Sequence, residues 1–74
     1  MTFKFFTNAS EGFEGTSIAI NPNHIISVLE KKVVVAGEEG NREEKQSILF
    51  GGSNGTWIVT EDMLTVVARL NERD

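Results

Sequence analysis

The chain has 74 residues, a formal net charge of −4 and no cysteine. This length allows one domain, near the lower limit at which a single core offsets the loss of chain entropy. Without cysteine, the chain can form no disulfide framework, thiolate metal site or cysteine nucleophile, which fits a reducing cytoplasmic location. The acidic surplus opposes the counterion release that drives most nucleic-acid binding, so nucleic acid is a disfavoured partner. We expect a single domain over residues 1–74, stabilised by packing or self-association.

The N-terminal segment predicts a strand followed by a loop. Residues 2–7 are rich in phenylalanine, which favours a strand over a helix. In an extended chain, Phe3 and Phe5 lie on one face and Phe6 on the other. The apolar stretch is too short for a signal peptide or a membrane span, so no membrane role is expected. Residues 8–15 carry two glycines and several turn formers, which is typical of a loop.

The next segment predicts a second strand and then a turn. Residues 16–20 form the strand, and the Asn-Pro-Asn sequence at 21–23 ends it because proline lacks an N–H donor. Residues 24–36 have apolar positions at helical spacing, yet their β-branched side chains favour a strand. We choose a strand, which is either one long strand, with or without a bulge near residues 30 and 31, or two short ones. A helix over 24–30 would change the topology.

The second half predicts a hairpin followed by one helix. Residues 37–44 are acidic and lack an apolar anchor, so we expect a mobile hairpin tip. Strands at 46–50 and 56–59 follow, joined by a loop rich in glycine at 51–55. A helix is then expected over residues 60–73.

The expected helix has an acidic start and an apolar face. Thr60 is the expected N-cap, with acidic residues in the first turn, as the helix dipole favours. Two arginines, Arg69 and Arg73, lie near the C-terminal end. The apolar face recurs at helical spacing and consists of Met63, Val66, Val67 and Leu70, with Leu64 at its edge.

No group of residues predicts catalysis or cofactor binding. His24 could act as a general base or a metal ligand, but a catalytic histidine needs an orienting acid and a nucleophile, and zinc needs three or four ligands. The acidic pairs at 38–39 and 43–44 lack the alternating spacing of a calcium loop. The glycine-rich loop at 51–55 lacks the lysine and hydroxyl of a phosphate loop. We expect no enzyme activity, no catalytic residue, no metal and no cofactor.

The apolar content exceeds what one short helix can cover. Several strands carry apolar side chains on both faces, so the sheet either curls into a barrel or is covered by a second copy. We expect a homo-oligomer, with an unidentified protein as a possible additional partner. The expected interaction residues are Trp57, Phe3, Phe5 and Phe6, although burial of Trp57 under the helix is an equal alternative.

The order of these segments resembles a known family. An Asn-Pro turn precedes isoleucine at 21–25, an Asn-Gly pair precedes tryptophan and valine at 54–59, and a helix containing valine closes the chain. Over residues 18–70 this arrangement is similar to the short FlbD-like flagellar proteins. The resemblance implies an architecture of a sheet and a helix, and no functional residue is carried over. The aromatic first strand and the longer acidic insertion depart from that pattern.

The sequence therefore predicts an α+β fold of about five short, mainly antiparallel strands, curled into a sheet or partial barrel and closed by a C-terminal helix. The expected function is a non-enzymatic interaction or assembly module that self-associates. The first alternative is a small nucleic-acid-associated regulator using Lys31, Lys32 and Lys45. The second is a small-molecule-binding or enzymatic domain centred on His24.

Overall fold

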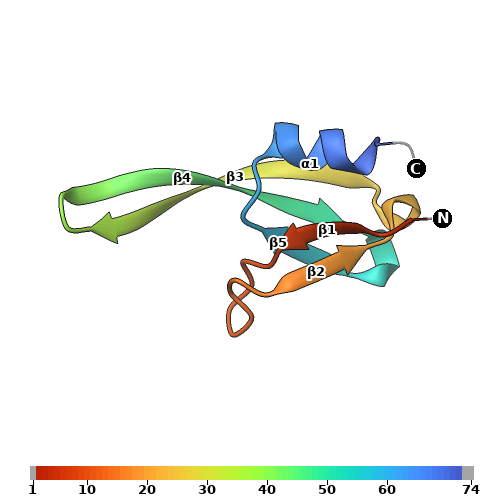
Figure 1. Cartoon of the computed structure of the whole chain (residues 1–74), viewed down its shortest axis with the longest axis horizontal. Coiled ribbons are helices and arrows are strands. Elements are labelled where there is room, and N and C mark those ends of the chain that lie inside the picture. The colour runs from red at the N-terminus through yellow and green to blue at the C-terminus, as the bar shows by residue number, and fades with distance from the viewer. Residues whose placement is uncertain (1, 73–74) are drawn as a thin grey trace.

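The computed structural model describes residues 2–72, and it arranges five strands and one α-helix around a small core (Figure 1). In chain order the elements are β1 (Lys4–Thr7), β2 (Ser17–Ile20), the 3-10 turn η1 (Pro22–His24), β3 (Ser27–Gly37), β4 (Gly40–Phe50), the 3-10 turn η2 (Gly52–Asn54), β5 (Thr56–Val59) and α1 (Met63–Leu70). This order confirms the predicted α+β class.

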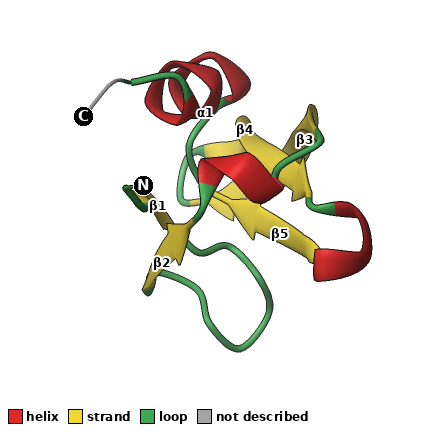
Figure 2. Cartoon of the chain, turned by 90° about the vertical axis from the view of Figure 1, so that its right-hand side faces the viewer, coloured by secondary structure: helices red, strands yellow, loops and turns green. Residues whose placement is uncertain are grey.

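The strands form two antiparallel sheets that meet along β5. One sheet contains β1 and β2, and the other has the order β3-β4-β5. The two sheets are joined where the Thr60 N–H donates to the Thr7 carbonyl oxygen at 2.9 Å and the Ala9 N–H donates to the Ile58 carbonyl oxygen at 2.9 Å. The smaller sheet and α1 therefore lie on the same side of the three-stranded sheet (Figure 2).

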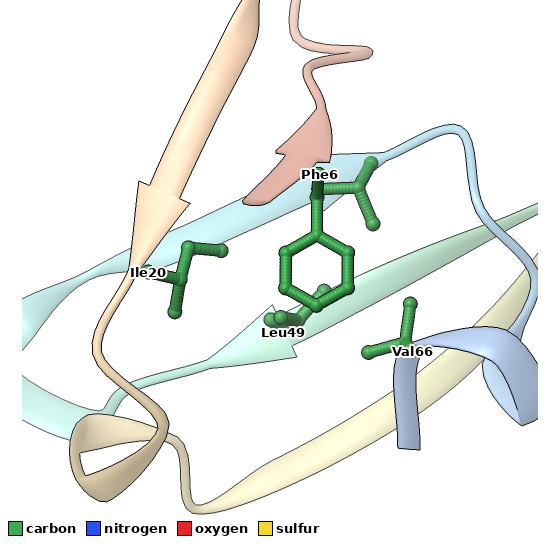
Figure 3. Close-up of a cluster of buried hydrophobic side chains, with 5 residues drawn as sticks. Phe6, Ile20, Leu49 and Val66 are labelled. Carbon is green, nitrogen blue, oxygen red and sulfur yellow. The ribbon is translucent and has the colours of Figure 1, made fainter. Parts of the chain in front are cut away.

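The core lies between the sheets and the helix (Figure 3). Side chains from β1, β2, β4, β5 and α1 meet there, and each is almost completely buried. These side chains are Phe6, Ile20, Leu49, Val59 and Val66. We call the side of the three-stranded sheet that carries Leu49 and Val59 its inner face. Successive residues of a strand alternate between faces. The residues of β4 and β5 next to Leu49 and Val59 in sequence therefore lie on the opposite face, which we call the outer face.

The segment before β3 differs in part from the prediction. His24 lies in η1, where the Asn21 side chain accepts a hydrogen bond from the Asn23 N–H at 3.0 Å and Pro22 occupies the first turn. The strand begins at Ser27 and continues to Gly37 in one unbroken register with β4. The choice of a strand over a helix is therefore confirmed for most of residues 24–36, as one long strand without a bulge near residues 30 and 31.

The prediction of a mobile tip over residues 37–44 was wrong. Gly37 pairs with Gly40, so a two-residue turn joins β3 to β4, and the ladder runs on through pairs such as Val35 with Arg42 and Val33 with Glu44. The run of valines supplies strong β propensity, and the backbone of residues 40–44 pairs with it although their side chains are polar. Sequence hydropathy alone does not show this pairing.

The paired residues 31–46 form an arm that projects from the body of the domain (Figure 1). The described chain measures 44 × 23 × 19 Å and has a radius of gyration of 13.0 Å. A compact chain of this length has a radius of gyration of about 11 Å. The difference reflects the arm, which lies beyond the core.

The helix begins two residues later than predicted. Asp62 is the N-cap, and its carboxylate accepts a hydrogen bond from the Thr65 N–H at 2.9 Å. Thr60 instead continues the contact with β1, and the buried Ser47 hydroxyl donates to the Glu61 carbonyl oxygen at 2.8 Å. These bonds keep the chain extended past Thr60 and displace the cap. Arg73, placed in the predicted helix, lies outside the described residues.

Candidate interaction surface

The aromatic side chains of the first strand divide between the surface and the core. Phe3 and Phe5 are 52% and 64% exposed, whereas Phe6 is 2% exposed. Phe6 pairs with Ile18 across the small sheet, on the face that meets the core. The expected place of Phe6 on an interaction surface is therefore wrong, because strand alternation turns it inward while its neighbours point outward. Phe3 and Phe5 remain available for contact.

Trp57 lies on the inner face, opposite Leu49, and is half-buried against the core. Its ring covers Gly51, where an added Cβ would lie 2.7 Å from Trp57 Cζ3 and 2.9 Å from the His24 carbonyl oxygen. The glycine loop thus has a packing role, since only a residue without a side chain allows this approach. Trp57 therefore anchors the turn between β4 and β5 and is half-buried there, which favours a packing role over an exposed interface anchor, at this turn instead of under the helix as the alternative expected.

A polar cluster ties β1 to the start of α1. The Glu61 carboxylate accepts hydrogen bonds from the Thr7 N–H at 3.0 and 3.1 Å and from the Thr7 hydroxyl at 3.1 Å. Arg69 Nη1 donates to Glu61 Oε2 at 3.2 Å and to the Phe5 carbonyl oxygen at 2.9 Å. The Arg69 guanidinium also lies 5.5 Å from the centre of the Phe6 ring. This cluster positions β1, with its exposed Phe5, relative to the helix.

The cluster shifts the titration of Glu61. Burial by itself raises the pKa of Glu61, but the hydrogen bonds from Thr7 and from its own backbone, together with the Arg69 charge, outweigh burial. The net pKa of Glu61 lies below its ordinary value of 4.5. Its role is structural, because every group that holds the carboxylate belongs to the packing between β1 and α1.

Apolar side chains are exposed on both faces of the three-stranded sheet. On the outer face, Leu29 pairs with Ile48 and Ile48 pairs with Ile58, which forms an apolar row across all three strands. Leu29 is 54% exposed, and on the inner side of the arm Val34 is 68% exposed. Sequence reasoning missed both residues, although the alternation of three valines already requires the middle one to face away from its neighbours.

The start of β3 lines a groove with the helix. This groove has a volume of about 330 Å³. Its lining comes from η1, the following residues, the start of β3 and the end of α1, and most of the side chains are apolar. The apolar lining residues include Ile25, Ile26, Val28, Val67 and Leu70.

The three lysines of the nucleic-acid alternative do not share one face. Lys32 pairs with Lys45 on the inner side of the arm, whereas Lys31 pairs with Gln46 on the outer side. Hydrogen bonding to Thr65 lowers the pKa of Asp62, and the nearby charge of Lys45 contributes to the same direction. Lys45 therefore has a carboxylate in its surroundings, and the basic surface is divided.

The described residues contain no group of three or more potential metal ligands. His24 is exposed in η1, and its backbone N–H donates to the Asn21 carbonyl oxygen at 3.0 Å. In the same part of the chain, no helix has the length and apolar character needed to cross a membrane. Comparisons with protein-family models, curated proteins and solved structures found no match to this chain. The resemblance to FlbD-like proteins stays a prediction.

Proposed function

We propose that this protein is a non-enzymatic assembly module that associates with further copies of itself. The observation that carries the proposal is the arm of residues 31–46, which extends beyond the core and exposes Val34. A two-stranded ribbon is at best marginally stable in water unless it packs on another element. A long arm with apolar side chains is therefore suited to packing against another protein.

The apolar row of Leu29, Ile48 and Ile58 supports the same proposal, because Leu29 is exposed and the two isoleucines beside it are only partly buried. Isolated apolar residues on a protein surface are ordinary, but contiguous apolar patches are typical of interaction sites. Phe5 in β1 and Phe3 just before it add exposed aromatic area beside the other sheet. The nucleic-acid alternative has less support, because Lys31 faces away from Lys32 and Lys45 and the chain is acidic.

The test is the solution mass by light scattering over a wide concentration range. A shortened variant lacks residues 33–36 and 41–44, so both strands of the arm lose the same number of residues, while the turn and the alternation of faces are retained. We expect wild-type protein to form a stable oligomer and the shortened variant to be a monomer with unchanged Trp57 fluorescence. A wild-type monomer at every concentration up to the solubility limit would contradict self-association.

A further inference from the structure

The edge of β3 that faces away from β4 presents unpaired backbone groups along the arm and the body. Within residues 2–72 this strand is at the edge of its sheet. The tight turn makes Gly37 and Gly40 a hydrogen-bonded pair, and such pairs alternate along an antiparallel ladder. The odd-numbered residues of β3 therefore bond to β4, and the even-numbered residues direct their N–H and C=O groups outward. An open edge of this kind is a template for another strand.

We propose that two copies of this chain pair through β3, antiparallel and about a two-fold axis at Lys31. This inference rests on the self-association proposed above and assigns its surface. When the two-fold axis is normal to the sheet, residues that face the same side of the sheet lie opposite each other in the two copies. Even-numbered residues of one copy then pair with even-numbered residues of the other, and odd-numbered residues pair with odd-numbered ones. When the axis passes at Lys31, Glu30 of each copy lies opposite Lys32 of the other copy, which makes two such pairs.

Other registers lose this charge complementarity. An axis at Glu30 brings two glutamates together, and an axis at Lys32 brings two lysines together. Like charges directly opposite each other destabilise a sheet, whereas opposite charges stabilise it. At the Lys31 register, Leu29 also meets Val33 on the outer face. The pattern of β3 thus favours one register over its neighbours.

The monomer contains an unfavourable pair that this arrangement relieves. Lys32 lies directly opposite Lys45 within the hairpin, and both side chains are exposed. Two lysines in this position repel each other, and the Asp62 carboxylate near Lys45 offsets only part of this repulsion. In the dimer, Glu30 of the second copy lies on the other side of Lys32, so a carboxylate joins the two ammonium groups. The charge arrangement of the arm is better satisfied with a second copy than without it.

The groove beside β3 receives the arm of the second copy. At this register Val34 of one copy lies opposite Val28 of the other, on the inner face. Val28 lines the groove together with Val67, and both are incompletely buried in one copy. The arm of each copy runs along the body of the other, so the exposed Val34 side chain gains apolar neighbours. Each projecting arm thereby covers the other copy's groove.

The register carries one cost. Lys31 lies on the two-fold axis and faces Lys31 of the second copy on the outer side of the sheet. This repulsion weakens the dimer, while the two Glu30 and Lys32 pairs on the opposite face offset it. Replacing Lys31 with threonine keeps a strand-forming residue and removes both charges at the axis. We expect the Lys31→Thr variant to bind itself more tightly than wild type.

The experiment uses charge exchange at the two paired positions, with dimer affinity measured by analytical ultracentrifugation. Glu30→Lys places lysines opposite each other in its own dimer, and Lys32→Glu does the same with glutamates. We expect each variant alone to dimerise at least about tenfold more weakly. An equimolar mixture of the two variants should form a heterodimer, and the double variant E30K/K32E should regain wild-type affinity. Glu11→Lys makes the same charge change in the exposed loop between β1 and β2, so it is the control and should dimerise like wild type.

The outcomes separate this inference from the proposed function. If wild type dimerises but both single variants retain wild-type affinity, or if their mixture fails to form heterodimers, β3 pairing is wrong while self-association stands. If wild type is monomeric at all concentrations, the proposed self-association fails together with this interface. Circular dichroism of each variant establishes that the fold is retained. A misfolded single variant leaves the double variant as the test, and its failure to dimerise overturns the proposal.

Discussion

Substituting Glu61 with glutamine tests whether the polar cluster holds β1 on the helix. The Glu61 side chain is only 13% exposed and accepts three hydrogen bonds from Thr7 as well as one from Arg69. Glutamine keeps the shape but loses the charge, and its amide nitrogen cannot accept. Hydrogen bonds to a charged group each contribute about 2 kcal/mol, and glutamine retains some of them. We expect Glu61→Gln to reduce the free energy of unfolding by about 2 kcal/mol.

The stability difference between wild type and Glu61→Gln should depend on pH. Because the pKa of Glu61 is lowered in the folded state, the carboxylate stabilises the fold fully above its ordinary pKa of 4.5. This contribution is lost as the pH falls through the lower pKa of the folded state. The difference between wild type and Glu61→Gln should therefore be greatest at neutral pH and should decrease below pH 4.5.

The assay is urea unfolding followed by Trp57 fluorescence, at one fixed protein concentration and at several pH values. In thermal unfolding, a second measurement of the same loss, about 2 kcal/mol corresponds to a fall of about 10 °C in the midpoint for a domain of this size. Glu11→Gln, in the exposed loop before β2, changes the net charge equally and should leave the stability unchanged. Equal stability of wild type and Glu61→Gln at neutral pH, or a difference independent of pH, would refute the reasoning.

Three further substitutions test the turn, the edge and the sheet-to-helix contact. Gly51→Ala should cost about 1–3 kcal/mol and alter Trp57 fluorescence, because its Cβ would meet the ring at 2.7 Å; unchanged emission and stability would contradict this packing. Val34→Pro removes an outward N–H and should abolish the dimer in sedimentation while circular dichroism is retained, and an unaffected dimer would count against β3 pairing. Ser47→Ala should cost about 1–3 kcal/mol in urea unfolding, since the Glu61 carbonyl loses a buried donor; a neutral result would mean that water replaces the hydroxyl.

The sequence predicted the elements whose chemistry is local. The glycine-rich loop between residues 50 and 56, the Asn-Pro turn after β2 and the strand-forming valines each act on their own neighbourhood, and these elements form. The helix start was misplaced because Thr60 and Asp62 are both good caps. The choice between them is made by the contact of Thr60 with Thr7, which is distant in sequence. Long-range bonds of this kind leave no local signal.

The candidate surface was predicted less well for the same reason. Period-two alternation already separated Phe6 from Phe3 and Phe5, but which face would be covered depended on where the second sheet and the helix packed. The sequence left open whether Trp57 lies on the surface or in the core. In the structure its ring packs over Gly51, which has no side chain to block it. The arm was missed because its second strand is polar. Pairing of polar strands is set by backbone hydrogen bonds, which hydropathy does not report.

The small core and the long arm are connected physically. The body of the domain is held by a few fully buried side chains, and none of them comes from the arm. The arm is therefore the part of the fold whose strand pairing receives the least support from a single copy. In the proposed dimer, a second β3 strand adds backbone hydrogen bonds along the arm and places Val34 against Val28 of the other copy. In the proposed dimer, association and the stability of the arm are therefore coupled, so a substitution that weakens either one weakens both.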